Sequence, residues 1–228
     1  MSDLCRQNLV TVGKGQGKHL ECARSLTVSI VAMQYDASGS PSTVGRLIFL
    51  VGPSGSGKDS LIDASWAKLT EHGIMVARRV ITRSPEALGE AAQGVSPEQF
   101  EQMRAGGHFA MYWQANALAY GIPAQIDQWL QAGKHVLVNG SRAYLAEARR
   151  RYPDLLAIRL EVNPTVLRQR LLARGRETPQ AIEQRLQRSA ELQVTAADNV
   201  HVLDNSQTLE QSVTSLFALL QVEGLLQA

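Results

Sequence analysis

The sequence predicts an α/β fold in which a central parallel sheet is covered by helices on both faces. After about residue 45, short apolar runs alternate with amphipathic helical patterns, and the connections between them are short. The runs are apolar without interruption, so we expect strands that are buried on both sides, as parallel strands are. Crossover helices between such strands complete a three-layer α/β/α arrangement.

The first elements surround a glycine-rich loop. Residues 46–51 (RLIFLV) form an apolar run, and after the loop a helical pattern places Ile62, Trp66 and Leu69 on one face before ending near Gly73. Residues 74–82 then predict a second strand.

The middle of the chain combines helix caps with extended segments. Residues 96–99 (SPEQ) have the pattern of a capping box with proline at the first helical position, which predicts a helix through about Ala105. Residues 109–123 are extended and contain aromatic residues, and residues 124–132 predict a helix closed by Gly133.

The last third repeats the strand and helix alternation. We expect strands over residues 135–139, 156–162 and 200–203, and helices over 141–151, from Asn163-Pro164 to about Arg174, and from Thr178-Pro179 onward. The final helix is predicted by apolar residues at spacings of three and four: Leu209, Val213, Leu216, Phe217 and Leu220.

Composition excludes several classes of protein. The chain has 228 residues, 44% hydrophobic and 19% charged, with a formal net charge of +2, which is unlike a disordered chain or a protein that coats nucleic acid or membranes. The two cysteines, Cys5 and Cys22, cannot form a disulfide framework around the core, so we expect a cytoplasmic protein without a transmembrane helix. The apolar stretch 26–33 resembles a signal-peptide core, but Asp3 and Glu21 interrupt its basic flank.

The chain divides near residue 45. Residues 1–45 are predicted to be a poorly structured extension that ends in the turn-rich linker 36–45, residues 46–222 a single domain, and residues 223–228 a tail. Met33 would serve as an internal start, and we expect a chain beginning there to keep full activity.

The most specific motif is a phosphate-binding loop with the Walker A spacing between a strand and a helix. Its glycines let backbone N–H groups surround a polyphosphate, and the lysine and the helix N-terminus add positive charge. A glycine-rich turn that binds nothing is the less favoured alternative. The motif predicts an ATP site made of Gly52, Pro53, Ser54, Gly55, Ser56, Gly57, Lys58, Asp59 and Ser60.

Asp59 stands where the motif usually has a serine or threonine that contacts Mg²⁺, and Ser60 follows it. A carboxylate is also a suitable ligand for this ion. Asp59 and Ser60 are therefore the candidate Mg²⁺ ligands, although Asp59 is equally suited to favour the helix N-terminus by its charge alone.

Positive charge is concentrated near the end of the chain, where ten of the 18 arginines fall between Arg149 and Arg188. Arg149–Arg151 and Arg188 are expected on solvated helix faces. Guanidinium groups on a lid over about residues 168–190 would neutralise a transferring phosphoryl group. The candidate catalytic residues are Lys58 of the phosphate-binding loop and Arg170, Arg174 and Arg185 of the lid. Arg176, also in the lid, is a candidate ATP ligand.

The motifs follow one another in the order found in guanylate kinases, which the chain resembles over about residues 46–222. They are GPSGSGKDS, Ile81-Thr-Arg83, Gly107-His-Phe109, Tyr120-Gly121 and ARGRET (residues 173–178) with Arg185. The resemblance implies a guanylate-kinase-like P-loop fold with a helical lid, and Mg²⁺ with ATP as phosphoryl donor.

The chain departs from guanylate kinases where those enzymes bind GMP. Met111 replaces the glutamate that reads the guanine edge, Ala92 replaces a tyrosine that holds the acceptor phosphate, and Ile122 replaces a small hydroxyl residue. An apolar pocket would leave the guanine edge unpaired, so GMP is not the expected acceptor.

Within the superfamily, the ITR segment, VNGSR (residues 138–142) and RQRLLARGRE (residues 168–177) most resemble ribose 1,5-bisphosphate phosphokinases of phosphonate catabolism. That resemblance implies transfer of the γ-phosphoryl group to ribose 1,5-bisphosphate, giving 5-phosphoribosyl 1-diphosphate. The candidate acceptor residues are Arg83, Glu90, Tyr120, Asn139 and Arg142.

Two alternatives stay open at this point. One is a nucleoside monophosphate kinase of guanylate type, and the other is a guanylate-kinase-like module that binds a protein partner without catalysis. The expected partners are the small molecules ATP and ribose 1,5-bisphosphate, with neither nucleic acid nor membrane, and a homodimer is left open.

Overall fold

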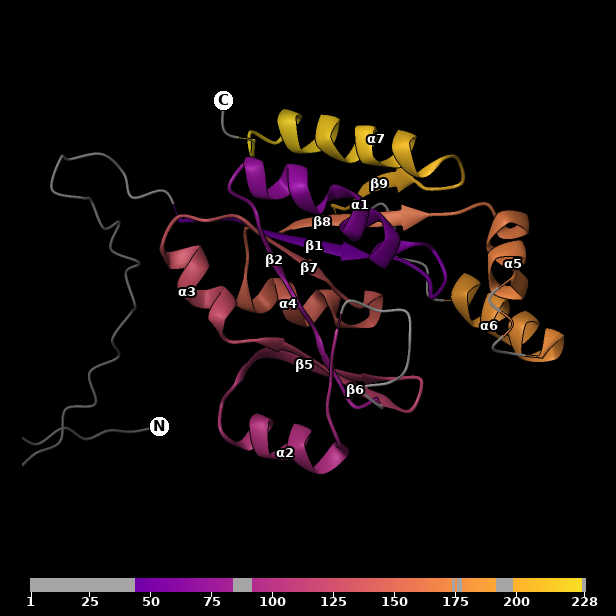
Figure 1. Ribbon diagram of the computed structural model, residues 1–228, viewed down its shortest axis with the longest axis horizontal. Helices are drawn as coiled ribbons and strands as arrows, with labels where there is room; N and C mark the ends of the chain where they lie inside the picture. Colours follow the sequence, from indigo (N-terminus) through magenta and orange to yellow (C-terminus); the bar gives the residue numbers. More distant parts are fainter. Residues whose placement is uncertain (1–43, 84–91, 174, 176–177, 192–198, 227–228) are drawn as a thin grey trace, which may run out of the picture. The chain divides into compact units, whose positions relative to one another are not determined.

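A computed structural model describes residues 44–83, 92–173, 175, 178–191 and 199–226, which form an α/β fold with two sheets (Figure 1). The larger sheet has five parallel strands in the order β2-β7-β1-β8-β9. Its strands are β1 (Leu47–Val51), β2 (Met75–Ala77), β7 (Val136–Asn139), β8 (Leu156–Glu161) and β9 (His201–Asp204). The predicted parallel sheet is confirmed.

Helices cover both faces of this sheet. On one face, α3 (Gln125–Gln131) and α4 (Leu145–Arg151) pack on the side chains of Leu47, Phe49 and Val51. On the other face, α1 (Lys58–Glu71) and α7 (Leu209–Val222) pack on Ile48 and Leu50. Alternate residues of the central strand thus serve two cores, and the predicted three-layer arrangement is confirmed.

The prediction of a single strand over residues 74–82 was wrong. Residues 74–82 form two short strands, β2 and β3 (Val80–Ile81), that belong to different sheets. Arg78 and Arg79 separate them, because the exposed Arg78 stacks on Trp66 whereas Arg79 turns inward toward Asp59. The apolar pattern continued across this bend, so it indicated one strand.

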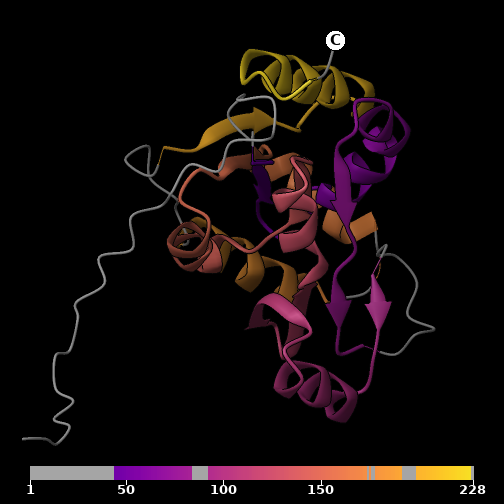
Figure 2. The same cartoon turned by 90° about the vertical axis from the view of Figure 1, so that its left-hand side faces the viewer.

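The smaller sheet has the order β4-β3-β6-β5 and was not predicted. It consists of β3, β4 (Gln93–Gly94), β5 (Phe109–Ala115) and β6 (Leu118–Pro123), and it carries α2 (Pro97–Ala105). The Ser96 capping box is confirmed, since Gln99 N donates to Ser96 Oγ at 3.2 Å and Ser96 N donates to Gln99 Oε1 at 2.9 Å. Figure 2 shows α2 and α7 on opposite sides of the larger sheet.

Two helices form the predicted lid region. They are α5 (Pro164–Ala173) and α6 (Pro179–Glu191), which pack on one another through Leu167, Leu171 and Ile182. Arg174 and Arg176 lie outside the described residues, as do Glu90 and residues 1–43. No helix in the described ranges is both long enough and apolar enough to cross a bilayer.

Candidate active site

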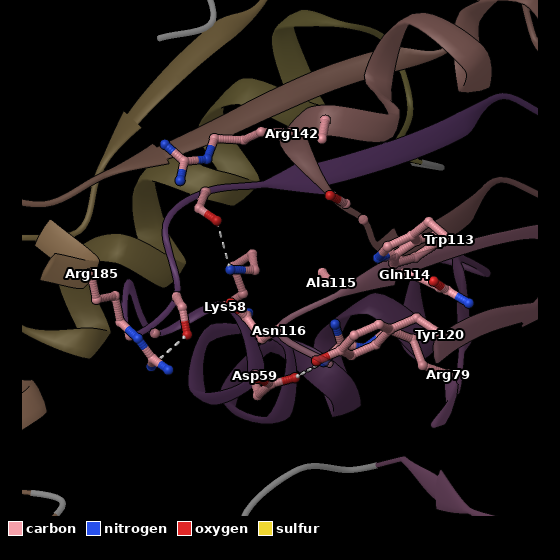
Figure 3. Close-up of a pocket in the computed structure, with 17 residues that line it drawn as sticks. Lys58, Asp59, Arg79, Trp113, Gln114, Ala115, Asn116, Tyr120, Arg142 and Arg185 are labelled. Atoms are coloured by element: carbon pink, nitrogen blue, oxygen red, sulfur yellow. Dashed lines mark hydrogen bonds and ion pairs between the residues drawn. The ribbon is translucent and has the colours of Figure 1, made fainter. Parts of the chain in front are cut away.

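A cavity of about 260 Å³ opens where the glycine-rich loop follows β1 (Figure 3). The loop lines one side of it, the segment after β7 contributes Gly140–Ala143, and the β5–β6 hairpin lines the other side with residues 113–116 and Tyr120. Arg185 reaches the loop side from α6. The cavity therefore lies at the carboxyl ends of parallel strands, where α/β proteins bind ligands.

The loop conformation depends on glycine. Gly55 and Gly57 have φ angles of 91° and 87°, a region that other residues rarely adopt. A Cβ atom on Gly55 would come within 2.8 Å of Leu171 Cδ2, and one on Gly57 within 2.7 Å of Asn205 Nδ2. Both the backbone angles and the packing behind the loop exclude larger residues.

Asn205 fixes the loop from behind. Its side chain is 3% exposed, and its Nδ2 donates to the carbonyl oxygen of Ser56 at 2.5 Å. The Asn205 backbone N–H donates to Glu161 O at 2.8 Å, which ties the end of β9 to β8. The loop is thus held in shape by the sheet behind it as well as by its own residues.

Three cations surround the loop. Lys58 Nζ donates to the carbonyl oxygens of Gly52 and Pro53 at 2.9 and 3.0 Å, and Arg185 Nη1 donates to Ser54 Oγ at 3.2 Å. Arg170 lies next to Gly57, and its Nη1 is buried without a hydrogen-bond partner among the described residues. A buried unpaired guanidinium nitrogen is costly, which is consistent with a place for an anion.

Asp59 lies in the first turn of α1 and lines the cavity, and its carboxylate already accepts hydrogen bonds. Its Oδ1 accepts hydrogen bonds from Asn139 Nδ2 at 2.7 Å and from Arg79 Nη2 at 3.1 Å. Asn139 is 4% exposed, and its own Oδ1 is buried without a partner in the described part of the chain. The sequence predicted Asp59 and Asn139 as site residues without indicating that they bind each other.

These residues fit Mg²⁺ held mainly by substrate. No cluster of three or more His, Cys, Asp or Glu side chains suited to a metal occurs within the described ranges. In phosphoryl transfer, however, Mg²⁺ is bound by one or two carboxylates, phosphates and water. The Asp59 carboxylate, which lines the cavity, and the orphaned Asn139 oxygen match that donor set. Neither Asn139 nor Ser60 lines the cavity, and Ser60 is exposed.

The far wall is aromatic. Trp113 and Tyr120 stack with ring centroids 5.7 Å apart and planes 6° from parallel, and Tyr144 packs on Trp113 at 5.5 Å. Burial is the main cause that raises the pKa of Tyr144, whose phenol therefore stays protonated. The rings give this wall a rigid shape.

Arg142 adds positive charge above the loop. Burial is the first cause that lowers the pKa of its guanidinium, and the charge of Arg159 lowers that pKa further. Arg159, on β8, pairs with Glu161 at 2.5 Å. Arg142 lines the cavity, and its guanidinium group is suited to bind an anion there.

The cavity brings together nine of the 15 predicted site residues that the structure describes. Those that line it are Gly52, Ser54, Gly55, Gly57, Lys58, Asp59, Tyr120, Arg142 and Arg185. Pro53, Ser56, Ser60, Arg83, Asn139 and Arg170 are described but do not line it.

Sequence reasoning missed Arg79, Trp113 and Asn205. A charged residue inside the apolar pattern of residues 74–82 was a signal for Arg79. Asn205 follows the last strand directly, and a polar residue at the carboxyl end of a parallel strand was a signal there. Trp113 gave no signal beyond its aromatic character.

The two positions at which guanine recognition was expected to be lost lie in the core. Met111 and Ile122 are both 0% exposed and face each other across the β5–β6 pair. Their side chains pack with Ile126 of α3 and leave no polar group at these positions to read a base edge.

The chain is similar to known kinases along most of its length. Residues 44–223 match the family model of guanylate kinase. The chain is 59% identical to the ribose 1,5-bisphosphate phosphokinase PhnN of Pseudomonas paraeruginosa over 76% of its own length and 94% of that protein. It is 58% identical to the protein of the same name from Azotobacter vinelandii, with coverage of 78% and 96%.

A solved structure confirms the fold. The crystal structure of guanylate kinase from Anaplasma phagocytophilum matches with a TM-score of 0.60 and 18% identity, over 80% of this chain and 87% of that one. The expected guanylate-kinase-like α/β fold is therefore confirmed.

Proposed function

The chain belongs to the guanylate kinase family and, within it, to the ribose 1,5-bisphosphate phosphokinases, and we propose that it transfers the γ-phosphoryl group of ATP to the 1-phosphate of ribose 1,5-bisphosphate. The products are 5-phosphoribosyl 1-diphosphate and ADP, formed during phosphonate degradation. The observation that carries the proposal is the 59% identity that extends over 94% of a relative with this name.

The loop side of the cavity is suited to bind the donor. Backbone N–H groups of the loop surround the β- and γ-phosphates, and Lys58 exchanges its carbonyl contacts for phosphate oxygens. Arg170 and Arg185, which already lie against the loop, neutralise the charge that spreads over the transferring group. We assign the same role to Arg174 and the ATP contact to Arg176.

Mg²⁺ is the proposed cofactor, and Asp59 with Asn139 would hold it or its water ligands. When bound, the ion neutralises charge on the donor phosphates. The chain's own part is to orient the Asp59 carboxylate, to which Asn139 donates a hydrogen bond.

The chemistry requires positioning rather than proton removal. An oxygen of the acceptor 1-phosphate, which is largely ionised near neutral pH, attacks the γ-phosphorus atom. A new P–O bond forms to that oxygen, and the bond between the γ-phosphorus and the β–γ bridging oxygen breaks, so that ADP leaves with the electron pair. Because the nucleophile is already an anion, the cations around the cavity account for the catalysis.

The alternatives are not favoured. A guanylate-type kinase would need a polar group to read the base, and Met111 and Ile122 lie in the apolar core instead. A non-catalytic interaction module would have no need of a constrained loop with Lys58, Arg170 and Arg185 around it. We further propose that residues 46–222 hold the whole catalytic machinery, that Arg83 and Glu90 contact the acceptor, and that the protein acts in the cytoplasm.

A coupled assay of ADP release tests the proposed function. Ribose 1,5-bisphosphate, ribose 5-phosphate and GMP are offered separately with ATP and Mg²⁺ to the full chain. We expect the highest kcat/KM with ribose 1,5-bisphosphate, and a higher kcat/KM with GMP would contradict the proposal. Omitting the acceptor measures the background of ATP hydrolysis.

A further inference from the structure

Arg79 is a buried cation at the junction of the two sheets. It lies between β2 of the larger sheet and β3 of the smaller one and is 8% exposed. It lines the cavity, and Figure 3 shows it beside Tyr120, on the side of the cavity away from Arg185. A guanidinium group is seldom buried without an anionic partner, so its environment indicates what it binds.

Its contacts join the loop side of the cavity to the aromatic wall. Arg79 Nη2 lies 3.1 Å from Asp59 Oδ1, in the first turn of α1, and the guanidinium carbon lies 5.5 Å from the centroid of the Tyr120 ring on β6. Since Asp59 is next to Lys58, Arg79 stands close to where the γ-phosphate is proposed to bind, but on the acceptor side.

The bond to Asp59 is one that a phosphate can replace. Charge-assisted N–H···O bonds are commonly 2.7–2.9 Å, and Arg79 prefers two parallel bonds to one anion. The contact with Asp59 is longer, at 3.1 Å, and uses the oxygen that also accepts from Asn139 at 2.7 Å. A phosphate dianion offers three oxygens and more charge than a carboxylate, and arginine matches its geometry.

The other cations that line the cavity lie away from Arg79. Lys58 and Arg185 contact atoms of the loop itself, which places them with the donor phosphates. Arg142 lies after β7 near Arg159, at the other end of the cavity from Arg79 in Figure 3. An acceptor with a phosphate at each end can therefore be held at two separate cationic points.

Resting on the function proposed above, we propose that Arg79 binds the acceptor phosphate that attacks ATP, and that it leaves Asp59 for this phosphate when the acceptor enters. Acceptor binding then releases Asp59 Oδ1 from one of its two hydrogen bonds, while Asn139 keeps the carboxylate oriented. The second hydrogen-bonding position on Asp59 Oδ1 then becomes available only when the acceptor is bound.

The test measures dissociation constants by calorimetry on the full chain, separately for ribose 1,5-bisphosphate and for ATP. Arg79→Gln is expected to weaken acceptor binding about 10- to 100-fold and ATP binding less than about threefold, because one charge-assisted bond to the acceptor is lost. Arg78→Gln is the matched control: the neighbouring arginine stacks on Trp66, does not line the cavity, and should change neither constant.

Two further variants keep the proposal open to contradiction. Arg79→Lys retains the charge but not the planar fork, so it should fold, keep ATP binding and weaken acceptor binding about 3- to 10-fold. Asp59→Asn removes the competing carboxylate and should tighten binding of the acceptor alone by roughly threefold or more. Weaker acceptor binding by Asp59→Asn would contradict the exchange.

Failure of this inference is distinct from failure of the proposed function. If the unsubstituted chain phosphorylates ribose 1,5-bisphosphate but Arg79→Gln binds it as tightly as before, only the role of Arg79 is overturned. If Arg79→Gln binds neither ligand, the dissociation constants of Arg79→Lys distinguish a folding defect from a role in acceptor binding. If Arg79→Lys weakens binding of both ligands equally, the proposal is contradicted. If the unsubstituted chain neither binds nor phosphorylates ribose 1,5-bisphosphate, both proposals fall.

Discussion

The two sides of the cavity are built in different ways. The donor side is a contiguous loop, residues 52–60, whose shape depends on backbone angles and on Asn205 behind it. The acceptor side consists of side chains from separate elements: Arg79 before β3, Trp113 on β5, Tyr120 on β6, Asn139 on β7 and Arg142 after it. The donor site is made by the backbone of one loop, so it can stay the same while substitutions of separate side chains alter the acceptor specificity. This explains how one fold serves different acceptors.

The strongest test of the donor side is Lys58→Met. The substitution removes the charge that the loop directs to the phosphates while keeping a flexible side chain of similar length. We expect kcat/KM to fall about 10²- to 10³-fold or more, as when one electrostatic contact to a transition state is lost. The ADP-release assay measures it, and full activity of this variant would contradict the assignment of the loop.

Gly57→Ala tests whether the loop acts through its backbone. The substitution places a Cβ atom at φ 87° and within 2.7 Å of Asn205 Nδ2, so we expect about 2–3 kcal/mol of destabilisation and loss of ATP binding. Gly107→Ala is the matched control, because Gly107 has φ 70° but no atom within 4 Å of a Cβ. Equal destabilisation of the two variants in urea unfolding would show that contact with Asn205 does not matter.

Asn205→Ala separates the two sides further. The Ser56 carbonyl oxygen would lose the donor at 2.5 Å, at a cost of about 1–3 kcal/mol. We expect the KM for ATP to rise and the KM for ribose 1,5-bisphosphate to stay within about twofold, because the loop alone is disturbed. A parallel rise in both constants would indicate that the two sides are not independent.

Ala117→Gly tests the β5–β6 hairpin on the acceptor side. It should raise the free energy of unfolding slightly, whereas the loop substitutions above lower it. Ala117 has φ 60° in the two-residue β5–β6 turn, where a Cβ atom is unfavourable. We expect the free energy of unfolding to increase by about 0.5–1 kcal/mol. Ala119→Gly, in strand β6, should instead lower the free energy of unfolding by a similar amount. The denaturant midpoints of unfolding measure both changes.

Removal of residues 1–32, so that the chain begins at Met33, is expected to have no effect on either side. The family match covers residues 44–223, so the proposed machinery lies wholly after the removed segment. Activity and the unfolding midpoint should be unchanged, and loss of folding would assign that segment to the core.

The sequence predicted the donor side well because its signals are local. The loop, the cap of α2 and the alternation of strands and helices each depend on residues a few positions apart. The acceptor side was predicted only in part, because its geometry arises from long-range contacts such as that of Asp59 with Asn139, 80 residues later.

The second sheet shows the same limit. Its strands β3 and β4 have two residues each and pair only with partners elsewhere in the chain, so no periodicity could indicate them. Arg79 was missed for the same reason. Residues 74–82 were predicted as one strand, and that prediction did not include the bend between the two sheets at which Arg79 lies.

A competition between two acceptors tests the central claim most directly. Equal concentrations of ribose 1,5-bisphosphate and GMP are mixed with ATP, Mg²⁺ and the full chain, and the ratio of 5-phosphoribosyl 1-diphosphate to GDP gives the ratio of the two kcat/KM values. Because Met111 and Ile122 lie in the core and no polar group at these positions reads a base edge, we expect the diphosphate to exceed GDP by about 10²-fold or more. GDP as the main product would contradict the account.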